Sequence, residues 1–214
     1  GLFKWPTIGE IINSYKEGWS IFVSSLAVNL YTATNVVVLG MLTNNVIVGY
    51  YSAADKLITC VRRGIYAVSD AIYPFISKMM KDDISKGLQF IKKQIFLYLV
   101  VGLIGCTSLF FFSDTIVKLL FGADYNLTVD VLRILSFVPL AVAISTVFGE
   151  ETMLPLNMNS AYSRTLVLAA FFSLLSIFPL CYLWGAKGVA MTMLLTEFLI
   201  MIIMGGLLRK QLFQ

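Results

Sequence analysis

Six apolar stretches, each about long enough to cross a bilayer as a helix, limit how this sequence can fold more than any other feature. They cover residues 20–42, 46–78, 89–112, 127–149, 162–183 and 187–208. A helix crosses the hydrocarbon core with about 20 apolar residues, and lipid leaves no unpaired backbone groups, which favours helices. The residues are also 58% hydrophobic, more than a soluble domain of this size can bury. The sequence therefore predicts an all-α, polytopic membrane protein with a six-helix transmembrane bundle.

The residues before the first stretch have a different pattern. Ile8, Ile11 and Tyr15 recur at helical spacing, and Thr7 with Glu10 fits a capping box. We predict an amphipathic lead-in at the membrane interface over residues 1–18 and the six-helix bundle over residues 19–214. The alternative is that this segment simply extends the first transmembrane helix.

The connection after the third stretch predicts another short helix. The run from Ser113 to Tyr125 is too short and too charged to span. Asp114 is a suitable cap for its start, and Gly122 for its end. We predict a separate amphipathic helix on the external face.

The connections between stretches predict the orientation in the membrane. Successive connections lie on alternate sides of the membrane. The connections and chain ends on one side carry ten Lys and Arg residues, and those on the other side carry two. Cytoplasmic loops hold the excess of basic residues. Both ends of this segment are therefore expected in the cytoplasm, with the protein in a bacterial cytoplasmic (inner) membrane.

The second stretch contains an unusual number of charges. Its ionisable residues are Asp55, Lys56, Arg62, Arg63 and Asp70. At about 100° per residue they fall within roughly a third of the helix circumference, together with Tyr66. We call these five charged residues the charge stripe. A helix that faces lipid all round would not carry it, because a charge at the bilayer centre costs at least about 2.5–3.5 kcal/mol.

Two interpretations of the charge stripe remain open. In the first, Asp55 pairs with Arg62, and Arg63 pairs with Asp70, each two turns apart on one face. In the second, the stripe lines a hydrated cavity, with three cations against two anions. We favour the cavity, since water relieves the desolvation penalty without complete pairing.

Three further residues are candidates for the same site. Arg133 lies near the external end of the fourth stretch, and Pro139 should kink that helix. Glu197 lies in the middle of the sixth stretch and needs a partner there. A structural pair with the second helix is the favoured explanation, and an ion or proton coupling site is the alternative. Asn29 on the first helix could line the cavity.

The sequence lacks the patterns expected of other protein classes. It has no His, and Cys60, Cys106 and Cys181 lie singly in apolar runs, where we expect them to be buried. We therefore expect no metal site and no cofactor. Glu150 and Glu151 are expected to be solvated loop residues. No nucleophile constellation, phosphate loop or nucleic-acid-binding pattern is present, so we predict a transport path rather than an enzyme.

Several segments resemble the polysaccharide flippases of the Wzx type, in the superfamily of MATE exporters and the lipid II flippase. The resemblance rests on three runs, NLYTATNVVVLGMLTNNVIVGYYSAADKLI, AIYPFISK and LLFGADYNLTVDVLRILSFVPL. The resemblance covers essentially the whole chain. It rests on the order and spacing of these runs together rather than on one motif. The chain begins with Gly rather than Met, and the resemblance implies that it is the C-terminal half of a two-bundle transporter, with the N-terminal bundle as its partner.

The resemblance also implies a substrate and a set of site residues. Such flippases move an undecaprenyl-diphosphate-linked sugar repeat (for example an O-antigen unit) across the membrane. Cationic groups in the cavity would meet the anionic diphosphate. The residues expected to bind substrate are Arg62, Arg63, Lys56, Arg133, Asn29 and Tyr66. Asp55, Asp70 and Glu197 are expected to serve ion coupling or pairing. Further expected partners are membrane lipids, and the polymerase and chain-length machinery.

Two alternative functions remain open. An exporter of drugs or organic cations belongs to the same superfamily, but its cavity would favour acidic and aromatic groups. A membrane scaffold for polysaccharide assembly would not transport, and its charge stripe would be dry and fully paired.

Overall fold

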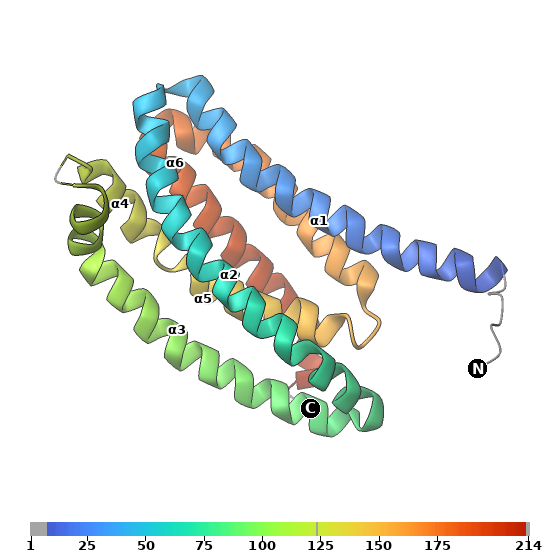
Figure 1. Ribbon diagram of the computed structural model, residues 1–214. Helices are drawn as coiled ribbons and strands as arrows, with labels where there is room; N and C mark the ends of the chain where they lie inside the picture. The colour runs from blue at the N-terminus through green and yellow to red at the C-terminus, as the bar shows by residue number, and fades with distance from the viewer. Residues whose placement is uncertain (1–7, 123, 213–214) are drawn as a thin grey trace, which may run out of the picture.

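The computed structural model describes residues 8–122 and 124–212, and every regular element in these ranges is a helix. The elements are α1 (Ile8–Leu42), α2 (Asn45–Asp82), α3 (Ile84–Phe121), α4 (Asn126–Leu135), α5 (Val138–Phe148), the π-helix η1 (Gly149–Met153) and α6 (Asn159–Leu212). The long helices run side by side as one bundle, with α2 between α1 and α3 (Figure 1). The all-α prediction is confirmed.

Within the described residues, four helical segments are long and apolar enough to cross a membrane. They are Phe22–Leu42, Ile84–Phe121, Asn126–Met153 and Asn159–Leu212. Many large apolar side chains also point outward, such as Phe96, Val101 and Ile104 on α3. In water such a surface would be costly, whereas lipid accommodates it. The chain is therefore a multi-pass membrane protein.

Helix α1 continues without a break from Ile8 to Leu42. The predicted boundary at residue 18 thus coincides with no interruption of the helix. Residues 1–7, with the capping residue Thr7, lie outside the described residues. Whether the lead-in lies at the membrane interface stays a prediction.

Asp83 forms the turn between α2 and α3 by itself. Its extended backbone ends α2, and its carboxylate accepts hydrogen bonds from the backbone N–H groups of Ser85 (3.0 Å) and Lys86 (3.3 Å) at the start of α3. The bond from the Lys86 N–H lowers the pKa of this exposed carboxyl group. This N-cap satisfies the first N–H groups of α3, so that α3 begins only one residue after α2 ends.

The predicted external helix over residues 113–125 is not a separate element. Residues 113–121 are the last turns of α3, because no Gly or Pro lies between Gly105 and Gly122 to interrupt the helix. Asp114 does not cap a helix; its carboxylate binds Lys118 Nζ one turn later, at 2.8 Å. Gly122 ends the helix as predicted, with a φ of 98° that favours glycine.

A break divides the fourth predicted stretch into α4 and α5. Helix α4 ends at Leu135, and Pro139 lies in the first turn of α5. Proline has no N–H to donate to the preceding turn, so it suits this position. The predicted kink at Pro139 is confirmed.

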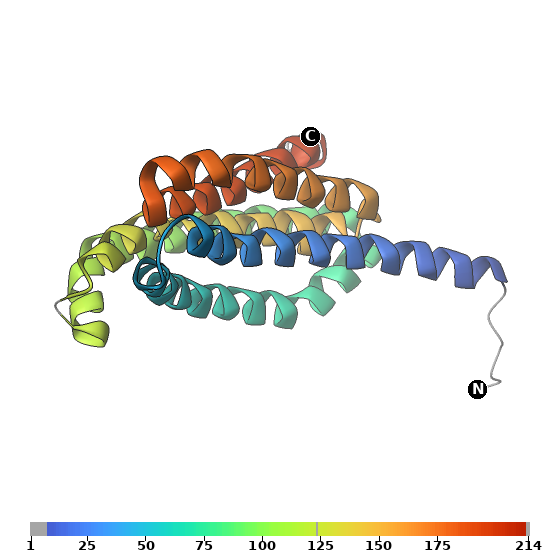
Figure 2. The same cartoon turned by 90° about the horizontal axis from the view of Figure 1, so that it is seen from above.

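Gly185 divides α6 into two arms. Its φ of 55° and ψ of −130° are not helical, and the chain reverses direction there, so that the arms run side by side (Figures 1 and 2). Leu166 and Ala169 of the first arm share a buried cluster with Ile200 and Met204 of the second. Helix α1 packs on the same cluster through Ala27 and Tyr31. This reversal lies between the predicted fifth and sixth stretches.

Candidate functional site

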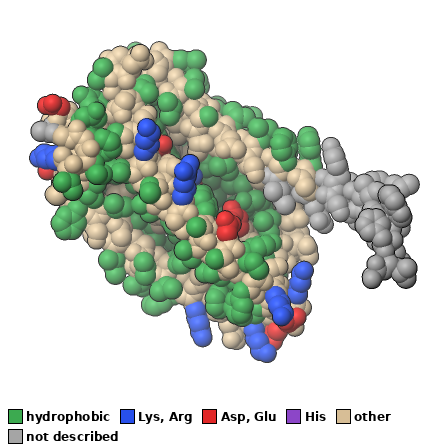
Figure 3. All heavy atoms as spheres, in the orientation of Figure 1, with side chains coloured by type: hydrophobic (Ala, Val, Ile, Leu, Met, Phe, Trp, Pro, Cys, Tyr) green, Lys and Arg blue, Asp and Glu red, His purple; other side chains and the backbone are tan. Residues whose placement is uncertain are grey.

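A polar cavity of about 590 Å³ lies between α1 and α2. Figure 3 shows the hollow on this face, with basic and acidic side chains near its edge. Its lining residues are Ser24, Ser25, Val28, Asn29 and Thr32 of α1, Thr59, Arg62, Arg63, Tyr66 and Asp70 of α2, Glu150 of η1, and Tyr162 and Leu166 of α6. The cavity therefore collects polar groups from four elements that are far apart in the sequence.

Five of the predicted site residues line this cavity: Asn29, Arg62, Arg63, Tyr66 and Asp70. They come together because residues at three- and four-residue spacing share one face of α2, and α1 crosses opposite that face. The cavity expected beside the charge stripe is thus present in the structure. The roles of its residues in binding stay predictions.

Arg62 and Glu197 form a buried ion pair behind the cavity. Arg62 Nη2 lies 3.6 Å from Glu197 Oε1, and the two side chains are only 10% and 4% exposed. The Tyr31 hydroxyl donates to the same Oε1 at 3.0 Å, and Tyr66 hydrogen-bonds the Arg62 side chain. The pairing of Glu197 with the second helix, which the sequence favoured, is confirmed by this geometry.

The pairs along α2 that the first interpretation of the charge stripe requires are absent among the ion pairs of residues 8–122 and 124–212. Arg62 extends across the bundle to Glu197 rather than along the helix to Asp55. Arg63 is exposed on the cavity rim with no ion-pair partner in the same described ranges. Arg62 Nε is buried and has no hydrogen-bond partner among the described residues. Both guanidinium groups therefore retain donors that face, or lie beside, the cavity.

Two predicted cations lie elsewhere. Arg133 does not line the cavity; its Nε donates to Ser113 Oγ of α3 at 3.1 Å, because α4 packs this side chain against α3. Its neighbour Asp130 pairs with Lys187 at 2.7 Å. Lys56 is exposed on α2 and is not a lining residue either, and Asp55, although half-buried, lies outside the cavity as well.

The expectation for the cysteines is wrong in one case. Cys106 and Cys181 are buried, but Cys60 is exposed on α2. Within the described residues, no group of three or more His, Cys, Asp or Glu is placed to hold a metal ion.

The expectation that Glu150 and Glu151 are solvated loop residues is also wrong. Both lie in η1, where Glu150 lines the cavity and Glu151 is completely buried. Glu151 Oε1 accepts from Ser69 Oγ and Oε2 accepts from Gln94 Nε2, both at 2.6 Å. Single π-helical turns occur often at functional sites. The sequence signal was a Glu pair directly after a predicted span. The signal of its partner was Gln94, which stands at the start of an apolar run on α3.

The charges around the cavity are separated along α2. Arg62 and Arg63 lie near the middle of α2, whereas Asp70 and Glu150 line the part toward the α2–α3 turn. Seven residues, or about 10 Å of helix, separate Arg63 from Asp70. The cavity wall is therefore cationic at one level and acidic at another, not uniformly positive.

We expect Glu151→Ala to destabilise the fold by about 2–4 kcal/mol. The change removes two short hydrogen bonds and leaves the buried Ser69 and Gln94 groups unsatisfied, each at about 1–3 kcal/mol. Glu151→Gln should cost less, because its side-chain oxygen still accepts one bond. The measurement is thermal unfolding of the detergent-purified full-length protein. Equal melting temperatures for the Glu151→Ala and Glu151→Gln variants would contradict this role.

The sequence matches known proteins of polysaccharide biosynthesis. Residues 1–80 match a family model described as "Polysaccharide biosynthesis protein". The chain is 31% identical over 194 residues to the "Putative O-antigen transporter" of Escherichia coli (strain K12), covering 91% of this chain and 47% of that protein. It is 30% identical over 195 residues to the protein of the same name from Shigella dysenteriae, covering 91% and 48%.

A more distant relative is the "Capsular polysaccharide biosynthesis protein CapF" of Staphylococcus aureus, 27% identical over 184 residues, covering 84% of this chain and 45% of that protein. The chain thus spans about half the length of the curated relatives it matches. No solved structure matches it. The first two names denote transport rather than catalysis, in agreement with the sequence, and the matches support its resemblance to Wzx-type polysaccharide flippases.

Proposed function

We propose that this chain, a relative of the O-antigen transporters, is the C-terminal half of a flippase for lipid-linked oligosaccharides. Its substrate would be a sugar repeat attached to a polyprenyl diphosphate. The second half, a matching N-terminal bundle, would close the cavity from the open side. The observation that carries the proposal is the polar cavity between α1 and α2, into which α2 presents Arg62 and Arg63.

The chemistry of the cavity fits an anionic head group. A guanidinium group can donate two parallel hydrogen bonds to a phosphate and keeps its charge at any physiological pH. Arg63 has no ion-pair partner among the described residues, and Arg62 retains an unpartnered Nε. Thr59, Asn29 and Ser25 on the same walls offer hydrogen bonds to sugar hydroxyl groups.

The proposed path across the membrane has six crossings in this half. These are α1, α2, α3, α4 with α5, and the two arms of α6. Lys and Arg side chains gather where α2 and α3 join (Figure 3), which favours a cytoplasmic position for that turn and for both ends of the segment. The two bundles would rock about the cavity in alternating access, in the cytoplasmic membrane, and deliver substrate to the polymerase and chain-length machinery.

The function is tested by Arg63→Ala in the full-length protein. A lost charge-assisted hydrogen bond is worth about 1.5–3 kcal/mol, so we expect surface polysaccharide to fall by about tenfold or more. The measurement is the amount of surface polysaccharide in a strain that depends on this protein, at equal protein level. Arg63→Lys should retain part of the activity, because it retains the charge.

Lys56→Ala is the matched control. It removes an exposed cation from the same helix, about two turns from Arg63, that does not line the cavity. We expect near-normal surface polysaccharide from this variant. Undiminished polysaccharide in Arg63→Ala, or equal losses in both variants, would exclude Arg63 as a substrate-binding residue.

A further inference from the structure

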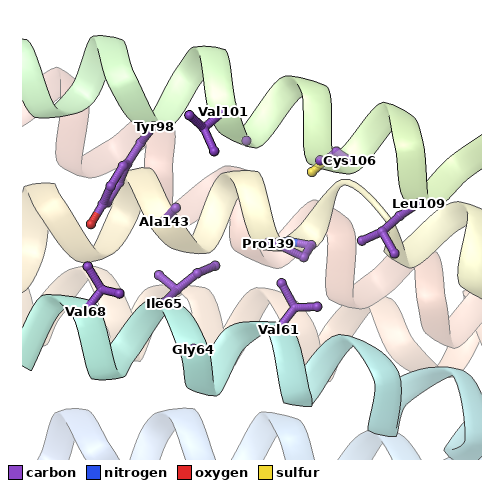
Figure 4. Close-up of a pocket in the computed structure, with 12 residues that line it drawn as sticks. Val61, Gly64, Ile65, Val68, Tyr98, Val101, Cys106, Leu109, Pro139 and Ala143 are labelled. Carbon is purple, nitrogen blue, oxygen red and sulfur yellow. The ribbon is translucent and has the colours of Figure 1, made fainter.

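An apolar groove of about 480 Å³ lies on the opposite side of α2 from the polar cavity. Figure 4 shows side chains of α2 and α3 pointing toward one another across it, with α5 behind them. Its lining residues are Val61, Gly64, Ile65 and Val68 of α2, Tyr98, Val101, Gly102, Gly105, Cys106 and Leu109 of α3, and Pro139 and Ala143 of α5. No charged residue is among them.

The groove has the dimensions of a lipid chain. Along α3 it extends from Tyr98 to Leu109, which is about 16 Å at 1.5 Å per residue. One leaflet contributes about 15 Å of the hydrocarbon core. Helix α3 and the segment that contains α5 are long and apolar enough to cross a membrane, and α2 lies beside them. An extended hydrocarbon chain parallel to α2 and α3 would fill the groove.

Two glycines make the groove deep. A Cβ atom built on Gly64 or on Gly105 would meet nothing within 4 Å. Their missing side chains are therefore not required for the packing of α2 against α3. By contrast, a Cβ on Gly102 would contact Leu140 Cδ1 at 2.7 Å, so that glycine serves close packing.

Only a surface of small side chains on α2 separates the groove from the polar cavity. Arg63 lies on the cavity rim, and the next residue, Gly64, lines the groove. Between these two faces α2 exposes Cys60 and Ala67, whose side chains are small. A flexible chain can therefore cross α2 from one site to the other without a large side chain in its path.

We propose that this groove holds the hydrocarbon chain of the lipid-linked substrate while the anionic head group occupies the polar cavity. Helix α2 would then contact both parts of one molecule, with Arg63 at the head group and Gly64 at the beginning of the chain. This inference rests on the proposed function, because it takes a polyprenyl diphosphate as the ligand.

The test uses the full-length protein in vesicles of phosphatidylethanolamine and phosphatidylglycerol. The probe is a polyprenyl diphosphate with a photoreactive benzophenone at the far end of its chain. We expect it to label peptides of α2 and α3. Gly64→Leu and Gly105→Leu fill the groove, and each should reduce this labelling at least fivefold. Gly206→Leu is the matched control, since a Cβ there also meets nothing within 4 Å and the residue lies on α6; it should leave labelling unchanged.

A second readout separates the chain from the head group. Thr59 lines the polar cavity, so Thr59→Cys, with Cys60 replaced by Ser, should be protected by the probe from a water-soluble maleimide. Protection of the Thr59→Cys thiol with undiminished α2 and α3 labelling in both filled variants would overturn the groove proposal and leave the function standing. If the probe gave no protection of the Thr59→Cys thiol and no labelling of α2 and α3, both the groove proposal and the proposed function would be overturned. If a higher share of phosphatidylglycerol in the vesicles reduced labelling as strongly as unlabelled polyprenyl diphosphate does, the groove would belong to bulk lipid and the proposal would be overturned.

Discussion

Glu197→Ala is expected to lower the free energy of unfolding by about 3–5 kcal/mol, which is the usual cost of removing one partner from a buried ion pair. The variant leaves Arg62 buried with its charge uncompensated and removes the acceptor of the Tyr31 hydroxyl. The Arg62 side chain and the Tyr31 hydroxyl lie where α1, α2 and the second arm of α6 meet inside the bundle. We therefore expect a large fall in the melting temperature of the purified protein and in its level in the membrane.

A double-mutant cycle tests the physical reason for this loss. Arg62→Met combined with Glu197→Met replaces both charges by apolar groups of similar length, and such replacements of buried pairs are often neutral or stabilising. The double variant should therefore be more stable than either single Met variant. Additive losses would show that the two side chains do not depend on each other. Because Arg62 lines the polar cavity, we expect the stable double variant to be defective in transport.

Gly188→Ala is expected to prevent correct folding of α6. A Cβ at this position would overlap the carbonyl group of Leu180 in the first arm. The obstacle is backbone, so it cannot move aside as the end of a flexible side chain could. Overpacking ordinarily costs about 1–3 kcal/mol, with larger costs where backbone must shift. We expect a cost above this range, seen as little or no folded protein in detergent extracts.

Gly206→Ala is the control for this substitution. Gly206 lies in the same arm of α6, and an added Cβ meets nothing within 4 Å. Alanine in a helix interior is favoured over glycine by about 0.5–1 kcal/mol, so the variant should be at least as stable as the parent. A Gly188→Ala protein that is extracted in normal yield, with an unchanged melting temperature, would show that the two arms do not approach as closely as described.

The elements of the fold were predictable where one local signal acted without competition. Pro139 placed the break between α4 and α5, and Gly122 placed the end of α3, because each residue limits its own backbone. The prediction failed at Ser113–Tyr125, where a short charged segment resembled a separate helix. Asp114 was available as a cap, but Lys118 one turn later offered its carboxylate a partner within a continuous helix.

The part of the candidate site that α2 contributes was predictable from the sequence. Helical periodicity places Arg62, Arg63, Tyr66 and Asp70 on one side of α2 whatever that helix packs against. The same pattern allowed pairing along α2, and Arg62 instead pairs with Glu197 from 135 residues further along the chain. Glu151 was misjudged for the same reason, since Ser69 and Gln94 reach it from two other helices.

The amino-acid pattern alone was enough to predict a helical membrane protein with its charges on one face of α2, because span length and side-chain direction depend only on local geometry. The partner of each charge depended on how the helices pack. Arg62 could be buried, Arg63 left on the rim and Arg133 turned away only after α1, α4 and α6 had taken their places around α2 and α3. Contacts between distant segments carry no local signature, and they decide which charges are compensated and which remain available to a ligand.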